Sequence, residues 1–129
     1  MTHELTYLTL VAAFTALMWV PYILNGLMVR GLTEAVGYPV NPKPLAAWAT
    51  RLKAAHYNAV ENLVVFAALV LTAHTAGVLN DVTLLATTVY FWARVVHAVV
   101  YALAIPWLRT LSFATGWLCC MAIAAQLLL

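Results

Sequence analysis

The residues best suited to chemistry in this sequence begin with a polar group at the start of an apolar segment. Asn58, Glu61 and Asn62 are spaced i, i+3 and i+4, so they share one face of a helix, and His56 comes just before them. The surrounding stretch, residues 51–66, changes within a few residues from basic to apolar. A carboxylate at the head of a membrane-crossing helix is costly unless it has a partner or faces a wet cavity. The spacing therefore poses the question of what this polar face holds.

A second polar stripe lies further along the chain. Its members fall at i, i+4, i+7 and i+11 of one helix: Tyr90, Arg94, His97 and Tyr101. An arginine in the middle of a membrane span costs at least a few kcal/mol and needs an acceptor, and the only acid within reach is Glu61. The two helices are expected to be antiparallel, because only a tight turn near residue 80 joins them. Counting equally in both directions from that turn places Glu61 at the same depth as Tyr101. Glu61 and Arg94 are then roughly 9 Å apart in height, a gap that a long side chain, helix tilt or a subunit boundary would close.

Two interpretations of these stripes remain open from spacing alone. In the first, they form a buried ion pair and a hydrogen-bonded ladder that fixes the helix register. In the second, they line a polar pocket that opens to one side of the membrane, made by Asn58, Glu61, Arg94, His97, Tyr101 and Arg109. The pocket gains support because more groups converge at one depth than can satisfy one another. Arg51, Lys53 and Arg109 at its mouth would attract an anionic, water-soluble ligand.

The composition requires a membrane as solvent for the elements that carry these residues. The chain has 129 residues, of which 66% are hydrophobic and 8% charged, whereas a soluble domain is about half apolar and about a quarter charged. Six Lys and Arg residues spread along the chain form no basic patch, so nucleic-acid binding is disfavoured. Cys119 and Cys120 are adjacent in an apolar run and lack CxxC spacing, which favours buried thiols over redox or metal chemistry, and no metal site is predicted.

Four apolar segments are long enough to cross the ~30 Å hydrocarbon core. They predict an all-α fold, an integral membrane four-helix bundle in a single domain of residues 1–129, with spans at about 5–28, 55–79, 82–105 and 107–129. Pro21 predicts a kink in the first span. Asn80 or Asp81 is predicted to cap the third span, and Pro106 suits the first turn of the fourth.

The longest connection, at about residues 29–50, sets the predicted orientation. It is rich in Gly and Pro and predicts a loop on the membrane surface, with helix resuming around Leu45. This loop and its flanks hold Arg30, Lys43, Arg51 and Lys53, and the last turn holds Arg109. The positive-inside rule then places the loop in the cytoplasm and both chain ends outside.

Two motifs at these positions carry a resemblance to a known family. They are R-x4-H-x-N-x2-E, formed by Arg51, His56, Asn58 and Glu61, and R-x2-H-x3-Y, formed by Arg94, His97 and Tyr101. With four spans and a long first loop, the chain resembles the MAPEG family, the membrane-associated proteins of eicosanoid and glutathione metabolism, over nearly its whole length. The second motif looks closest to the microsomal prostaglandin E synthase and glutathione transferase branch. The resemblance is to a bacterial-type member, which implies a bacterial inner membrane.

The resemblance implies a homotrimer that binds glutathione between subunits near the cytoplasmic face. Asn58 and Glu61 would bind the polar backbone and amino group of glutathione, and the pocket would be completed by Arg51, His56, Arg94, His97, Tyr101 and Thr110. Arg109 would hold the sulfur as a thiolate, with Tyr101 as a second thiol partner, because a nearby cation favours the nucleophilic form. Several relatives have a second arginine three residues after the first, where this chain has Ala54.

The function implied by this resemblance is activation of the glutathione thiol. The expected reaction is transfer to an apolar electrophile or reduction of a lipid hydroperoxide, so the expected partners are further copies of the chain, membrane lipid and an apolar small molecule. The alternative is a non-catalytic membrane structural or accessory subunit that keeps the fold and uses the ladder only to hold helices together. A small transporter is a weaker alternative, because the 129 residues show no inverted repeat.

Overall fold

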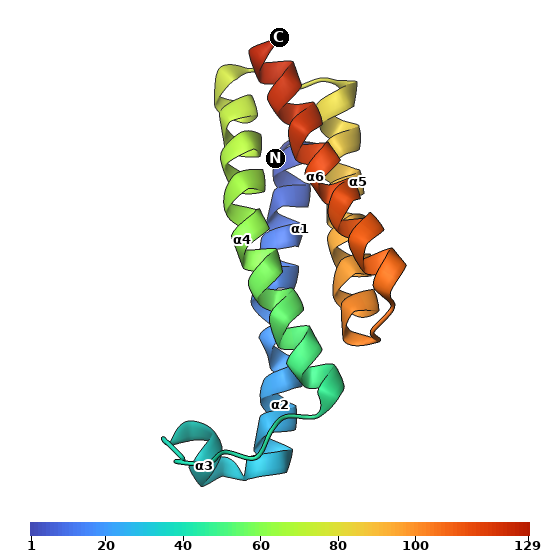
Figure 1. Cartoon of the computed structure of the whole chain (residues 1–129). Helices are drawn as coiled ribbons and strands as arrows, with labels where there is room; N and C mark the ends of the chain where they lie inside the picture. The colour runs from blue at the N-terminus through green and yellow to red at the C-terminus, as the bar shows by residue number, and fades with distance from the viewer.

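The computed structural model of the protein describes all 129 residues, and they form an all-helical bundle (Figure 1). The helices are α1 (His3–Leu17), α2 (Trp19–Arg30), α3 (Leu32–Val36), α4 (Ala47–Ala76), α5 (Asp81–Ala102) and α6 (Pro106–Leu128). Four units are long and apolar enough to cross a membrane: the continuous stretch His3–Arg30, α4, α5 and α6. The predicted fold class, four long apolar helices that suit a membrane bundle, is confirmed.

The first membrane-length unit is broken near its middle. Pro21 has no backbone N–H, so the carbonyl of Leu17 lacks its usual donor one turn later. Helix α1 ends at Leu17 and α2 begins at Trp19, while the N–H of Met18 reaches the carbonyl of Thr15 at 3.3 Å. The kink predicted from Pro21 is therefore present, and it lies just before the proline.

The connections between α4, α5 and α6 follow from local capping. Helix α4 ends at Ala76, where Gly77 takes a left-handed conformation with φ of 70°. Asn80 caps α5 as predicted, because its side chain accepts from the N–H groups of Val82 and Thr83. Helix α5 ends at Ala102 rather than near residue 105, since the chain turns back through residues 103–105 before α6 starts at Pro106.

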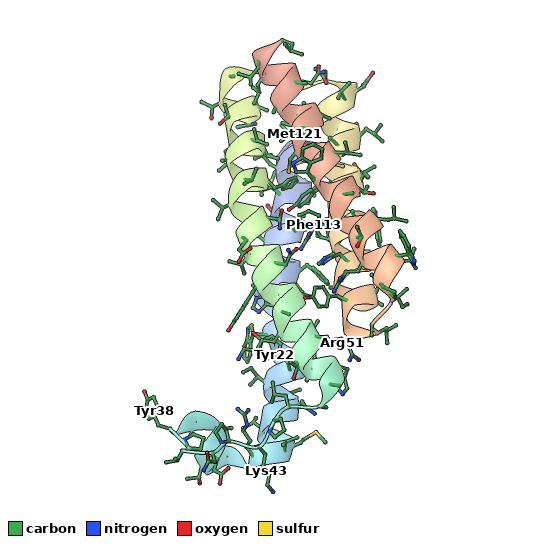
Figure 2. The ribbon with its side chains drawn as sticks, in the orientation of Figure 1. Tyr22, Tyr38, Lys43, Arg51, Phe113 and Met121 are labelled. Carbon is green, nitrogen blue, oxygen red and sulfur yellow. The ribbon has the colours of Figure 1, made fainter.

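The loop between the first two spans contains a short helix that the sequence did not predict. This helix, α3, projects sideways from the foot of α2 (Figure 1). The return path is held by two side chains: the Nε of Arg30 donates to the carbonyl of Lys43 at 2.7 Å, and Asn25 accepts from the N–H of Ala46 at 2.9 Å. In Figure 2, Lys43 marks this loop at the foot of α2, and Tyr38 marks its far side.

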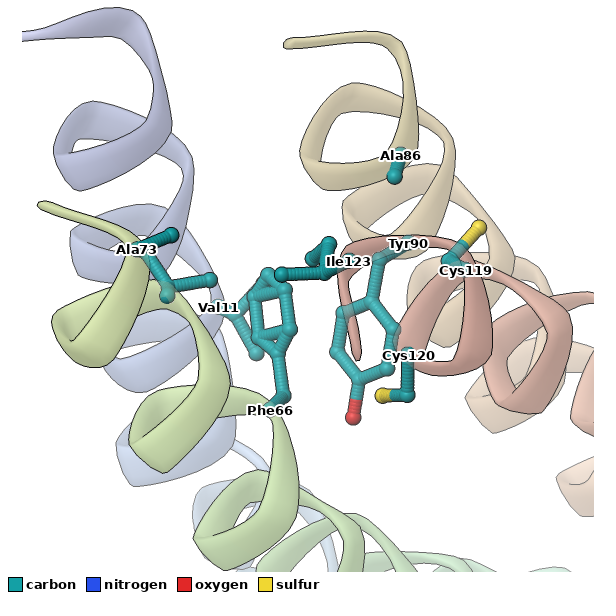
Figure 3. Packing of buried hydrophobic residues seen from close by; sticks show 9 residues of the cluster. Val11, Phe66, Ala73, Ala86, Tyr90, Cys119, Cys120 and Ile123 are labelled. Atoms are coloured by element: carbon teal, nitrogen blue, oxygen red, sulfur yellow. The ribbon is translucent and has the colours of Figure 1, made fainter. Parts of the chain in front are cut away.

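The main core lies in the half of the bundle that carries both chain ends. Its nine buried residues are Val11, Phe66, Val70, Ala73, Ala86, Tyr90, Cys119, Cys120 and Ile123 (Figure 3). The rings of Phe66 and Tyr90 are stacked with centroids 3.8 Å apart. A smaller cluster of Met18, Ala55, Ala59 and Ala98 lies toward the other end. Close contact of this kind drives helix association where lipid is as apolar as the side chains.

A buried carboxylate at the same end as the main core was missed in the sequence analysis. Glu4 is 6% exposed, and the hydroxyl of Thr83 donates to it at 2.8 Å. Thr2 accepts from the N–H of Leu5 and so starts α1 at His3, which brings Glu4 into the first helical turn. The capping threonine is the sequence signal that would have placed Glu4 in the first helical turn.

Candidate functional site

The buried arginine of α5 is bound by an amide of α4. Arg94 is 4% exposed, and its Nη2 donates to the Oδ1 of Asn58 at 2.7 Å. Glu61, which the sequence analysis took as the acceptor, is exposed and forms no ion pair with Arg94. The predicted ion pair between Glu61 and Arg94 is therefore wrong within one chain.

The helix register explains the error. In the structure Asn58 faces Arg94, and Phe66 faces Tyr90. Arg94 therefore lies within about one helical turn of the depth of Glu61. The sequence analysis had instead placed Tyr101 at the depth of Glu61. Rotation decides the outcome, because a residue three positions after Asn58 points about 60° away around the helix. Asn58 consequently faces α5, and Glu61 lies on the exposed surface of α4.

Two adjoining cavities collect most of the other predicted site residues. The first, about 180 Å³, is lined by Asn58, His97, Tyr101, Arg109, Thr110 and Phe113. The second, about 150 Å³, is lined by Arg51, Tyr101, Ala104, Ile105, Pro106 and Arg109. Tyr101 and Arg109 belong to both cavities. Figure 2 shows Arg51 at the foot of the α5–α6 hairpin, at the end of the bundle opposite the chain termini.

Arg109 and Thr110 supply the free polar groups of these cavities. The guanidinium carbon of Arg109 lies 5.1 Å from the centre of the Tyr101 ring, a cation–π contact that fixes the charge beside the phenol. The hydroxyl of Thr110 reaches the carbonyl of Pro106 only at 3.4 Å, a long hydrogen bond that leaves the hydroxyl available. The Nε of Arg51 donates to the carbonyl of Ala102 at 2.9 Å and ties α4 to the end of α5.

His97 lies behind the first cavity and has unused hydrogen-bonding capacity. It is 2% exposed, and its ring meets the Tyr101 ring edge-on with centroids 5.5 Å apart. Its Nδ1 has no hydrogen-bond partner, and neither do the Nε of Arg94 and the hydroxyl of Tyr90 on the same helix. Such buried unpaired groups cost about 1–3 kcal/mol each, so α5 keeps polar capacity from Tyr90 to His97 at the expense of stability.

His56 is not brought to these cavities. Its Nδ1 is hydrogen-bonded to the hydroxyl of Tyr22 at 2.8 Å, and the two rings are tilted against each other. His56 precedes Asn58 by two positions, which is about 200° around a helix, so the two side chains point to different sides of α4. The prediction that His56 shares the pocket of Asn58 does not hold within one chain.

The cavities also include a residue that the sequence analysis did not select. Phe113 lines the first cavity, and its ring centre lies 6.3 Å from that of His97. It follows Arg109 by four positions, and this spacing on α6 is the signal that would have identified it. No three His, Cys, Asp or Glu side chains come together in an arrangement that would hold a metal ion.

Four long apolar helices with a polar cavity at one end of the bundle define an integral multi-pass membrane protein with a candidate ligand site. Residues 8–129 match the MAPEG family, and the chain belongs to that family. The family includes glutathione-dependent transferases and peroxidases, and its members are commonly trimeric. No individual curated protein and no solved structure was found to match the chain.

Proposed function

We propose that this MAPEG protein is a glutathione-dependent transferase or peroxidase of the prostaglandin E synthase and glutathione transferase branch. The observation that carries the proposal is the first cavity, where the Arg109 guanidinium, the Thr110 hydroxyl and the Asn58 amide meet beside Tyr101. These are the group types that hold an anionic sulfur and a peptide backbone. The second substrate is an apolar electrophile or a lipid hydroperoxide that arrives from the membrane.

The chemical role of the cavity is to activate the glutathione thiol. A thiolate is the nucleophile, and a fixed cation beside the sulfur favours the thiolate over the thiol. Arg109 supplies this charge, and its contact with the face of Tyr101 leaves its N–H groups free to donate to the sulfur. The Tyr101 and Thr110 hydroxyls are further donors at the same cavity. Such donors act strongly because they are oriented before the reaction begins.

The remainder of glutathione needs more space and more charge than one chain offers. The two cavities, at about 180 and 150 Å³, are each smaller than the ~300 Å³ at which small-molecule sites usually begin. Arg51 is available for a glutathione carboxylate, and exposed Glu61 is available for its ammonium group. We propose a homotrimer in which the exposed face of α4 in one copy completes the site of the next. From the distribution of Lys and Arg, we also propose that both chain ends lie outside a bacterial inner membrane.

One observation favours a second candidate, a non-catalytic accessory subunit. The amide oxygen of Asn58 is already bound by Arg94, so part of the polar ladder is satisfied within the chain. In that case the ladder holds α4 against α5 and no ligand is needed. The unpaired Nδ1 of buried His97 has no explanation in this second candidate.

Replacement of the cavity cation tests the catalytic proposal. Arg109→Ala is expected to lower the turnover of a model electrophile by about 10²–10³-fold, the usual loss when one oriented donor to a reacting anion is removed. The ultraviolet absorbance of bound thiolate should fall with it. Lys43→Ala, which removes a cation from the distant loop, is the matched control and should leave both unchanged. Unchanged thiolate and turnover in Arg109→Ala would contradict the proposal.

A further inference from the structure

The side-chain amide of Asn58 is held in one orientation by the buried arginine of α5. The Oδ1 of Asn58 lies 2.7 Å from the Nη2 of Arg94. A guanidinium group has donors and no acceptor, so the amide atom that faces it must be the oxygen. The Nδ2 of Asn62 lies 3.4 Å from the same oxygen and adds a second, long contact. Donors from within the chain therefore already occupy this oxygen.

The NH₂ group of the same amide is free. No atom of the chain accepts from the Nδ2 of Asn58, and this nitrogen is not sealed inside the bundle. Asn58 lines the first cavity, whereas Arg94 does not. Since the amide oxygen points toward Arg94, the NH₂ group is the end of the amide that is left to face the cavity. Asn58 thus offers a ligand two N–H donors and no acceptor.

Rotation of this amide is opposed by the position of Arg94. Arg94 is 4% exposed, the bond to Asn58 is its one hydrogen bond in the chain, and its Nε is unpaired. A 180° turn of the amide would set its NH₂ group against the guanidinium, donor against donor. The buried charge would then have no acceptor, which costs more than the loss of a hydrogen bond between neutral groups. The orientation of the Asn58 amide is therefore a consequence of Arg94.

We propose that Arg94 is a positioning residue, which orients the Asn58 amide so that its Nδ2 donates to a peptide carbonyl oxygen of glutathione. The inference rests on the proposed function and names the part of glutathione that Asn58 recognises. The ammonium group has donors only, so Asn58 does not bind it and it is left to exposed Glu61. The carboxylates are matched by a cation such as Arg51. A neutral amide donor is matched by the neutral carbonyls that flank the cysteine.

Asn62 provides a matched control on the same helix. Its Nδ2 donates to the backbone carbonyl of Asn58 at 2.8 Å, and it does not line the cavity. Asn58→Asp and Asn62→Asp both exchange an NH₂ group for an oxygen and add one negative charge. In Asn58→Asp the carboxylate still accepts from Arg94, so the contact between α4 and α5 is kept while the cavity loses its N–H donors. In Asn62→Asp the lost donors lie outside the cavity.

The first experiment measures the Kd of the purified full-length protein for glutathione and for two analogues, in each of which an (E)-alkene replaces one peptide bond and removes its carbonyl oxygen. One analogue is expected to bind the wild-type protein and Asn62→Asp about tenfold more weakly than glutathione, the loss of one hydrogen bond. Asn58→Asp should bind this analogue and glutathione equally, because added charge affects both ligands alike.

The outcomes separate this inference from the proposed function. If the wild-type protein binds glutathione and both analogues equally, or if Asn58→Asp keeps the wild-type preference for the carbonyl, the inference is overturned and the proposed function stands. If the wild-type protein does not bind glutathione, the inference and the proposed function fail together.

A second experiment tests the positioning role of Arg94 with Asn58 left intact. Arg94→Lys keeps a cation that has donors only, so it should keep the preference for the carbonyl. Arg94→Gln introduces an amide that donates and accepts, so the Asn58 amide can turn and the preference should fall to about threefold or less. Melting temperatures without ligand are recorded for both variants. A purely structural Arg94 would lower the melting temperature of Arg94→Gln but leave its preference at the wild-type value, and that result overturns the inference.

Discussion

At the end of the bundle that carries the chain termini, several polar side chains are paired with one another, although the hydroxyl of Tyr90 in the main core is not. Asn80 caps α5 and donates to Gln126, and Thr83 donates to buried Glu4. At the other end, buried His97 has an unpartnered nitrogen, and Arg109 and Thr110 border open cavities. The larger core cluster lies at the terminal end, whereas the cavity end has a smaller cluster of three alanines and Met18.

This difference separates stability from ligand binding along a single bundle. Packing and paired polar groups at the terminal end hold the helices together, so the polar groups at the other end need not satisfy one another. Unpaired polar groups are costly in a low-dielectric interior. They are expected where a ligand can supply the missing hydrogen-bond partner. The comparison predicts that substitutions at the terminal end change stability alone, while those at the cavity end change the response to glutathione.

The largest effect on stability is expected from Phe66→Ala. Phe66 is 0% exposed and stacks on Tyr90, so its removal leaves a cavity in the main core. The expected loss is about 3 kcal/mol, at the low end for a buried Phe because lipid already solvates apolar groups. Thermal unfolding in detergent measures it, with exposed Leu85→Ala as the control. Equal losses in the two variants would show that this core does not hold the bundle.

A smaller loss, about 2 kcal/mol, is expected from Asn58→Ala. The variant leaves the buried Arg94 charge without its acceptor, and a hydrogen bond to a charged group is worth about 1.5–3 kcal/mol. Adding Arg94→Met should recover most of the stability, because both polar partners are then gone. Denaturation of the single and double variants measures this recovery. If the double variant also regained a melting-point response to glutathione, Asn58 and Arg94 would have no part in the site.

The smallest effect is expected from Ala104→Gly, which should stabilise the protein by about 0.5 kcal/mol. Ala104 has φ of 61°, a left-handed conformation that costs a residue with a Cβ about 1–2 kcal/mol, and the greater freedom of glycine in the unfolded chain offsets part of the gain. Because Ala104 lines the second cavity, the strain lies at the candidate site. Thermal unfolding checks the sign, and a lower melting temperature would show that the turn is not strained.

The fold was predictable from the sequence because a membrane leaves few choices. Apolar length predicted four helices, and Pro21, Asn80 and Pro106 marked a kink, a cap and a helix start that the structure contains. The site was only partly predictable. Spacing placed Asn58, His97 and Tyr101 on the correct faces, whereas the Glu61 pairing and the place of His56 depend on helix rotation and register. When the assumed centre of the α4–α5 turn is a few residues from its true position, every predicted partner shifts by twice that number of residues, here about two helical turns.

The central claim, that the cavity end binds glutathione, is tested most directly by thermal unfolding with and without millimolar glutathione. A ligand that binds only the folded state stabilises it, by about 2.7 kcal/mol at a hundredfold excess over its Kd. The melting temperature of the wild-type protein and of Asn80→Ala, changed at the terminal end, is predicted to rise with glutathione, while that of Asn58→Ala is not. No rise in the wild-type protein would contradict the account.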